Sequence, residues 1–100
     1  MGLKNIEKAQ VLRLGDEVEY QQGQIVSKTL AQNRALSMTL FAFEPDEEIS
    51  THTADGDAFV TVLDGTGRFT MDGQAHHVSA RVSIVMPAHV RHAVHGHTRS

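Results

Sequence analysis

Apolar and polar residues alternate in short runs along most of this chain. Over residues 36–42, four apolar residues alternate with smaller polar ones, which is the two-residue period of a half-buried strand. Phe41 and Phe43 interrupt the alternation there, so we expect this strand to be covered on both faces. From Gln24 onward the same reading predicts further short strands, at 58–63, 68–71, 76–79, 82–86 and 90–95.

Turn signals separate these runs. Asp64-Gly65 and Asp72-Gly73 are typical of tight hairpin turns, and nothing sustains the i, i+3, i+4 spacing of a helix. Seven or eight short strands without helices predict an all-β sandwich or barrel. The residues before the first predicted strand are mixed in character. We therefore expect an N-terminal arm or edge strand over 1–23 and a β-barrel over 24–100.

Composition narrows the chemistry. The chain has no cysteine, which excludes disulfides and thiolate metal sites and suits a reducing cytoplasm. Its formal net charge is −3 and unclustered, which argues against nucleic acid as a partner. The apolar runs are too short to span a bilayer. Histidine is the unusually frequent residue, with seven in 100 residues.

Two of these histidines stand in strand-like passages that resemble the motifs of the cupin family. The first motif of that family reads G-x5-H-x-H-x3,4-E-x6-G. His52 matches its first histidine and Gly65 its closing glycine. Ala54 stands where the second histidine belongs, and Ala58 where the glutamate belongs.

The second cupin motif reads G-x5-P-x-G-x2-H-x3-N. Pro87 and His92 match its proline and histidine in their mutual spacing, whereas Arg81, His89 and Gly96 replace the other three residues. The resemblance covers about residues 36–96 and implies a small single-domain, cupin-type jelly-roll β-barrel. Such cupins usually continue past the second motif into a final apolar strand, whereas this sequence stops at Ser100 after the polar residues His95 to Arg99, so we expect a barrel that lacks its last strand. A barrel edge without its neighbour invites pairing with another chain, and we therefore expect a homodimer.

The resemblance also implies a divalent transition metal, such as iron, manganese, nickel or zinc, in the barrel cavity. His52 and His92 would be its ligands, with Asp57 as the first candidate for a third. Asp55 and His89 are alternatives for that position. Asp57 has a second interpretation, because turn aspartates commonly cap backbone amides.

Alternation predicts which residues face the cavity. His92 shares its strand face with Val94, while His95 and His97 occupy the opposite face. The predicted functions are a metal-dependent oxygenase, decarboxylase or isomerase, a metal-free module that binds a small molecule, or a structural dimer. The sequence leaves open whether the chain is an enzyme. The residues expected to line the cavity are Met38, Ala54, Ala58, Val60, Val62, Phe69, Met86 and His89.

Overall fold

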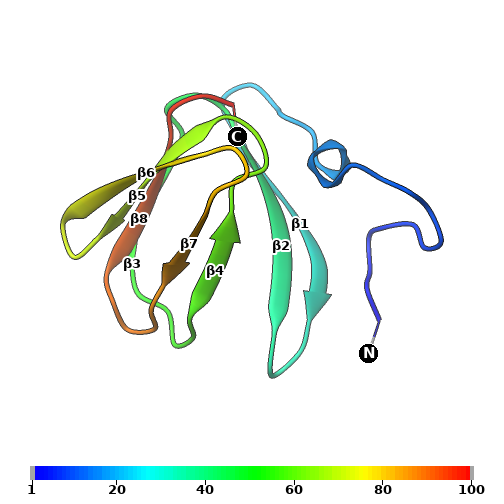
Figure 1. Ribbon diagram of the computed structural model, residues 1–100, viewed down its shortest axis with the longest axis horizontal. Coiled ribbons are helices and arrows are strands. Elements are labelled where there is room, and N and C mark those ends of the chain that lie inside the picture. Colours follow the sequence, from blue (N-terminus) through cyan, green and yellow to red (C-terminus); the bar gives the residue numbers. More distant parts are fainter. Residues whose placement is uncertain (1, 100) are drawn as a thin grey trace.

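The computed structural model describes residues 2–99. Within this range the chain is nearly all β, as its hydrophobic pattern predicts (Figure 1). One short 3-10 helix, η1 (Leu14–Glu17), precedes the strands. The strands are β1 (Ile25–Gln32), β2 (Ser37–Phe43), β3 (Glu48–His52), β4 (Ala58–Thr61), β5 (Thr66–Met71), β6 (Gln74–Ser79), β7 (Ser83–Met86) and β8 (His92–Gly96).

All pairings between the described strands are antiparallel. They form a four-stranded sheet of order β3-β8-β5-β6 and two separate pairs, the hairpin β1-β2 and the pair β4-β7, whose strands are not consecutive in the chain. Asp72 and Gly73 make the turn between β5 and β6 with positive φ angles of 48° and 79°, as the predicted hairpin requires.

One face of the four-stranded sheet supplies the core. Phe69 on β5 lies opposite His76 on β6 and Val94 on β8, and residues directly opposite one another point to the same face. Phe69 packs with Val62, Val78 and Met86, each at most 7% exposed. The β4-β7 pair adds partly buried residues around this cluster, namely Ala58, Val60 and Ile84.

The other face of this sheet is polar. Its central row runs across four strands as Glu48, His95, Arg68 and His77. The His95 ring lies between two carboxylates, with Nε2 3.3 Å from an oxygen of Asp46 and Nδ1 3.4 Å from an oxygen of Glu48. His95 therefore lies on the face opposite His92, as alternation predicts, although these contacts leave its side chain only 20% exposed.

Strand β2 has two unlike ends. Near its end, Ala42 and Phe43 are buried, at 1% and 7% exposed. Near its start, Met38 is 40% exposed and pairs with Ala31, just beyond a bulge in β1. Met38 lies beside the hairpin turn, where no other strand of the described chain pairs with β2. The alternation places Met38 in the cavity wall, but the projecting hairpin leaves it outside.

The residues before β1 form an arm that contains η1 and no strand among those described. Lys4 donates its backbone N–H to the carbonyl of Leu30 at 2.8 Å, and Asn5 Nδ2 donates to the carbonyl of Thr29 at 2.8 Å. The ammonium group of Lys28 donates to the carbonyl of Glu17 at 3.0 Å. These bonds hold the arm along β1. No described helix is long and apolar enough to cross a membrane.

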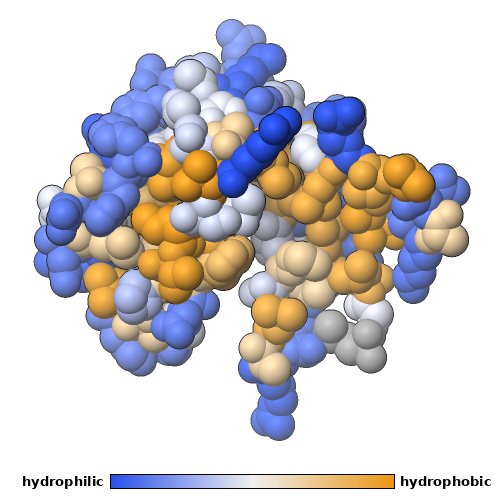
Figure 2. Space-filling model, in the orientation of Figure 1, coloured by the Kyte–Doolittle hydropathy of each residue, from blue (hydrophilic) through white to orange (hydrophobic). Residues whose placement is uncertain are grey.

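The barrel is open on one side. Strand β2 pairs with β1 and strand β4 pairs with β7, but the described chain supplies no strand between β2 and β4. Figure 2 shows apolar side chains gathered over β4 and β7, and a hollow between them and the β1-β2 hairpin. Phe59 and Val85 lie opposite each other on β4 and β7 and are 74% and 53% exposed.

Tyr20 ties the arm to the barrel and should make stability depend on high pH. Its hydroxyl donates to Asp64 at 3.4 Å, and the guanidinium of Arg99 lies 5.2 Å from the ring centre. Burial, and then the nearby carboxylate of Asp64, raise the pKa of Tyr20 above its ordinary value of 10.0. A raised folded-state pKa stabilises the native protein below pH 10.0, and this stabilisation is lost as the pH rises through the folded-state pKa.

We therefore expect the free energy of unfolding to fall at alkaline pH, and to fall less in Tyr20→Phe. Tyr20 is the only tyrosine and the chain has no tryptophan, so absorbance reports its titration directly. The Asp64→Asn variant should lower the Tyr20 pKa. An unchanged titration in that variant would contradict the assigned contribution of Asp64.

Candidate functional site

A bulge in β3 places His52 beside His92. Ile49 lies opposite Val94 and His52 lies opposite His92, so three steps along β3 correspond to two along β8. Without the extra residue, His52 would point away from the face that carries Ile49. Bulges commonly redirect a side chain in this way. The two histidines predicted from the motifs therefore meet on the core side of the sheet.

The two imidazole rings are in contact. Their centroids lie 4.2 Å apart and their planes meet at 67°, in an edge-to-face arrangement. Nδ1 of His52 lies 2.9 Å from the carbonyl of Ser50, and Nδ1 of His92 lies 3.1 Å from the carbonyl of Val90. Carbonyl oxygens only accept hydrogen bonds, so each Nδ1 carries the proton. In the neutral rings both Nε2 atoms are left as acceptors, available to a ligand.

Two hydrogen bonds join the loops that follow His52 and precede His92. Asp57 Oδ1 accepts the backbone N–H of Ala88 at 2.7 Å, and the carbonyl of Ala54 accepts that of His89 at 2.8 Å. His89 takes a left-handed φ of 66°, which non-glycine residues adopt only at some cost. Asp57 therefore has the capping contact that its second interpretation predicts, and it holds the two loops of the site together.

A resident metal would find too few protein donors here. Among residues 2–99, no group of three or more His, Cys, Asp or Glu side chains is placed to hold a metal ion. Catalytic zinc sites use three protein ligands, whereas His52 and His92 supply two. Asp57 directs one of its two carboxylate oxygens, Oδ1, to the N–H of Ala88. Ligation by His52, Asp57 and His92 stays a prediction.

Both histidines line a cavity of about 610 Å³ that reaches the opening between β2 and β4. This volume lies within the range of small-molecule pockets. His92 is 5% exposed and lies at the inner side, whereas His52 is exposed. The predicted residues that line this cavity are His52, Ala54, Asp57, Ala58, Val60, Val62, Phe69, Met86 and His92.

His89 and Met38 lie outside this lining. The His89 side chain is 73% exposed, and its Nδ1 lies 4.0 Å from an oxygen of Asp55. The left-handed backbone at His89 turns its side chain outward while its N–H bonds to Ala54. Asp55, the other alternative ligand, has a fully exposed side chain. Neither is placed to complete a metal site with His52 and His92.

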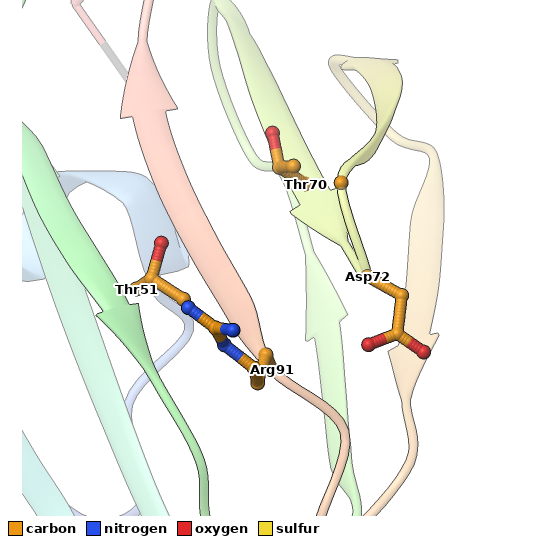
Figure 3. Close-up of a pocket in the computed structure, with 5 residues that line it drawn as sticks. Thr51, Thr70, Asp72 and Arg91 are labelled. Atoms are coloured by element: carbon orange, nitrogen blue, oxygen red, sulfur yellow. The ribbon is translucent and has the colours of Figure 1, made fainter.

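A second recess lies on the polar side of the four-stranded sheet and was not predicted from the sequence. It has a volume of about 460 Å³ and is lined by Thr51, Thr70, Asp72, Gly73 and Arg91. The Arg91 side chain extends toward Thr51, while the carboxylate of Asp72 points away (Figure 3). Residues 51, 70 and 91 come from separate segments and share no motif, so only the sheet pairing could have revealed this recess.

Comparison with known proteins tests the resemblance. Residues 39–100 match the sequence family described as the cupin domain, which is more than half of the chain. The chain belongs to the cupin family. The open arrangement of sheets described above is thus an incomplete cupin β-barrel.

Solved structures agree with this assignment. This cupin is similar to SPY1581, a conserved protein of unknown function from Streptococcus pyogenes, with 38% identity, a TM-score of 0.95, and coverage of 99% of this chain and 87% of that one. It is similar to a cupin superfamily protein from Desulfitobacterium hafniense, with 31% identity, a TM-score of 0.92, and coverage of 97% and 89%. A cupin 2 conserved barrel domain protein from Leptotrichia buccalis shares 44% identity, with a TM-score of 0.85 and coverage of 88% and 42%. Comparison with curated protein sequences finds no match.

The contact of Asp57 with Ala88 makes a prediction about the histidine pair. In Asp57→Ala the N–H of Ala88 loses its partner, and we expect about 1 kcal/mol lower stability together with faster hydrogen exchange at that amide. The imidazole signals of His52 and His92 should shift, because their loops separate. Asp57→Asn is the matched control, since its amide oxygen can still accept the bond. Equal exchange rates in both variants would contradict the assigned role.

Proposed function

We propose that this cupin binds a small, largely apolar organic molecule in its barrel cavity, with the His52–His92 pair as the polar centre. The observation that supports the proposal most directly is the hydrogen bonding of the two imidazole rings. Both Nδ1 atoms are occupied by backbone carbonyls at 2.9 and 3.1 Å, which leaves both Nε2 atoms to accept hydrogen bonds from a bound molecule.

The cavity walls favour an apolar or aromatic body for this molecule. Val60, Val62, Phe69 and Met86 line the cavity beside the histidines. Apolar walls with a few convergent polar groups are the usual form of a small-molecule site. Acceptor nitrogens select donors, so the ligand class is a small apolar molecule that carries a hydroxyl or N–H group.

Phenol and anisole form a suitable pair of probes, because they differ in whether the oxygen can donate. We expect phenol to shift the imidazole nitrogen signals of His52 and His92 and to raise the unfolding temperature, since a ligand of the native state stabilises it. Loss of one hydrogen bond in His52→Ala should weaken phenol binding about 2- to 10-fold. His97→Ala, an exposed imidazole outside the cavity lining, is the matched control. Equal effects of phenol and anisole would contradict the proposal.

Metal retention by the same protein distinguishes the metal-dependent alternative from binding of an organic molecule. Manganese, iron, nickel and zinc chlorides are added one at a time, and bound metal is measured after dialysis. The two-nitrogen donor set predicts that no ion is retained at one per chain. Retention that is lost in His52→Ala would instead favour a metal-dependent oxygenase, decarboxylase or isomerase with these two ligands. The cytoplasm remains the expected location, on the absence of cysteine.

A further inference from the structure

The recess on the polar side of the four-stranded sheet contains an arginine without a charged partner. Its lining residues are exposed except for Thr70, which is half-buried, so the recess is open to solvent. Among residues 2–99, the guanidinium of Arg91 makes no ion pair or hydrogen bond, whereas those of Arg13 and Arg99 each lie beside a carboxylate. Arg91 is therefore a positive charge available to a ligand.

The pairing of the strands explains why the surface is hollow here. The N–H of Asp72 donates to the carbonyl of Arg91 at 2.9 Å, which extends the β5-β8 pairing by one residue. Arg91 and Ala93 are two positions apart and share one face of β8, and Ala93 lies opposite Thr70 on β5. Because Ala93 carries only a methyl group, the surface beside Arg91 and Thr70 is low. Thr51 borders the recess from β3, on the other side of β8.

The two threonine hydroxyls flank the recess at a useful separation. β3 and β5 are the two neighbours of β8, so two strand spacings, about 9.6 Å, separate the backbones of Thr51 and Thr70. Two O–H···O bonds of about 2.7 Å each, with one oxyanion group between them, can bridge such a distance. Threonine hydroxyls can donate hydrogen bonds, and the planar fork of a guanidinium matches the oxygens of a carboxylate or phosphate.

The charges around the recess favour an anion. The Arg91 side chain extends toward Thr51, while the carboxylate of Asp72 points away from both (Figure 3). Glu48, the next carboxylate along β3, has an oxygen 3.4 Å from Nδ1 of His95. Asp72 is thus the one carboxylate that lines the recess, and its negative charge weakens the attraction without neutralising Arg91.

We propose that this recess binds the phosphate or carboxylate group of a small molecule, with Arg91 as its cation and the hydroxyls of Thr51 and Thr70 as donors. The recess has a volume of about 460 Å³, which lies within the range of small-molecule pockets and leaves room for the rest of that molecule. The site lies on the face of the sheet opposite the His52–His92 pair. It goes beyond the function proposed for the barrel cavity and stands whether or not that cavity binds a ligand.

Titration with sodium phosphate and with sodium acetate at constant ionic strength, followed by amide NMR, tests this site. We expect at least one of the two anions to shift the amide signals of Thr51, Thr70 and Arg91 to saturation, and that anion identifies the bound group. Arg91→Ala should weaken binding at least about tenfold, the equivalent of about 1.4 kcal/mol, because the charge-assisted bonds are lost. Arg81→Ala removes an exposed arginine beyond the other end of β6 and should leave binding unchanged.

Two further variants test the assigned charges. Asp72→Asn should strengthen binding about 2- to 5-fold, the effect of removing one exposed charge. Asparagine tolerates a left-handed backbone, so the turn at Asp72, with φ 48°, is kept. Arg91→Lys keeps the charge but loses the planar fork, and its affinity should lie between those of the parent and Arg91→Ala. Shifts that rise linearly with phosphate, acetate and sodium chloride alike would overturn the proposal, as would equal affinities in Arg91→Ala and Arg81→Ala.

Discussion

Replacing Gly65 with alanine should destabilise this protein more than any other single methyl group added at a described glycine. Gly65 has φ 74°, and a Cβ built on it would overlap the carbonyl oxygen of Arg99 and lie 2.5 Å from Oγ1 of Thr98. The left-handed backbone alone costs an alanine about 1–2 kcal/mol. Overpacking against backbone adds about 1–3 kcal/mol, and a protein of this size has about 5–15 kcal/mol in total.

The cause of the crowding is the turn that follows β4. Thr98 Oγ1 accepts the backbone N–H of Thr66 at 3.0 Å, and Arg99 Nε lies 3.0 Å from the buried carboxylate of Glu44. Residues 98 and 99 are thus held against the turn and cannot retreat without losing both contacts. We expect Gly65→Ala to lower the free energy of unfolding by about 2–5 kcal/mol, as measured by urea denaturation.

Gly73 supplies the matched control. Its φ is 79°, close to that of Gly65, but a Cβ there would meet nothing within 4 Å. Gly73→Ala should therefore cost only the backbone term of about 1–2 kcal/mol. If the two variants are equally stable, the packing of residues 98 and 99 over Gly65 is not what the structure indicates.

These two glycines also show how much of the fold can be predicted from local sequence. Both were predicted as hairpin turns from Asp-Gly pairs. Asp72-Gly73 does join the paired strands β5 and β6. Asp64-Gly65 instead joins β4 to β5, which lie in different sheets and do not pair, so the hairpin prediction is wrong there although Gly65 has a positive φ. The strands between them follow from alternation, because a two-residue period fixes which side chains meet the core. The exposed state of Met38 did not follow, since it depends on where the β1-β2 hairpin ends relative to the other sheets.

The candidate site was predictable in part for the same reason. His52 and His92 were identified from motif spacing, but their contact depends on the bulge between Ile49 and His52. No alternation rule predicts a bulge, because one extra residue reverses the facing of everything after it. The bond from Ala88 to Asp57 joins residues 31 positions apart. Such a bond requires both loops to be placed before either end can be recognised.

The second large effect is a gain of metal binding in the double variant Ala54→His, Ala58→Glu. Both alanines line the cavity with His52 and His92, and they occupy the positions where the cupin motif has its second histidine and its glutamate. The variant therefore offers three imidazoles and a carboxylate in place of two imidazoles. Since three protein ligands suffice for a catalytic zinc site, we expect affinity for zinc and manganese to rise on the order of a hundredfold.

Two readouts measure this gain. Elemental analysis after dialysis should find close to one ion per chain in the double variant, and bound ion should raise its stability by about 2.7 kcal/mol at a hundredfold excess over Kd. Adding His92→Ala should remove both effects, because His92 is the most buried member of the pair. Ser27→His, which adds an imidazole at an exposed position of β1 outside the cavity lining, controls for adventitious binding.

Comparing metal retention by the double variant with that by the parent chain decides between the two kinds of site. If the parent retains as much metal as the double variant, two imidazoles already suffice and the cavity belongs to a metal-dependent cupin. If only the double variant retains metal, the alanines at positions 54 and 58, in place of the histidine and glutamate of the cupin motif, explain why the parent chain does not bind it. The cavity would then be left to an organic ligand held by His52 and His92, because their two Nε2 acceptors remain free for it.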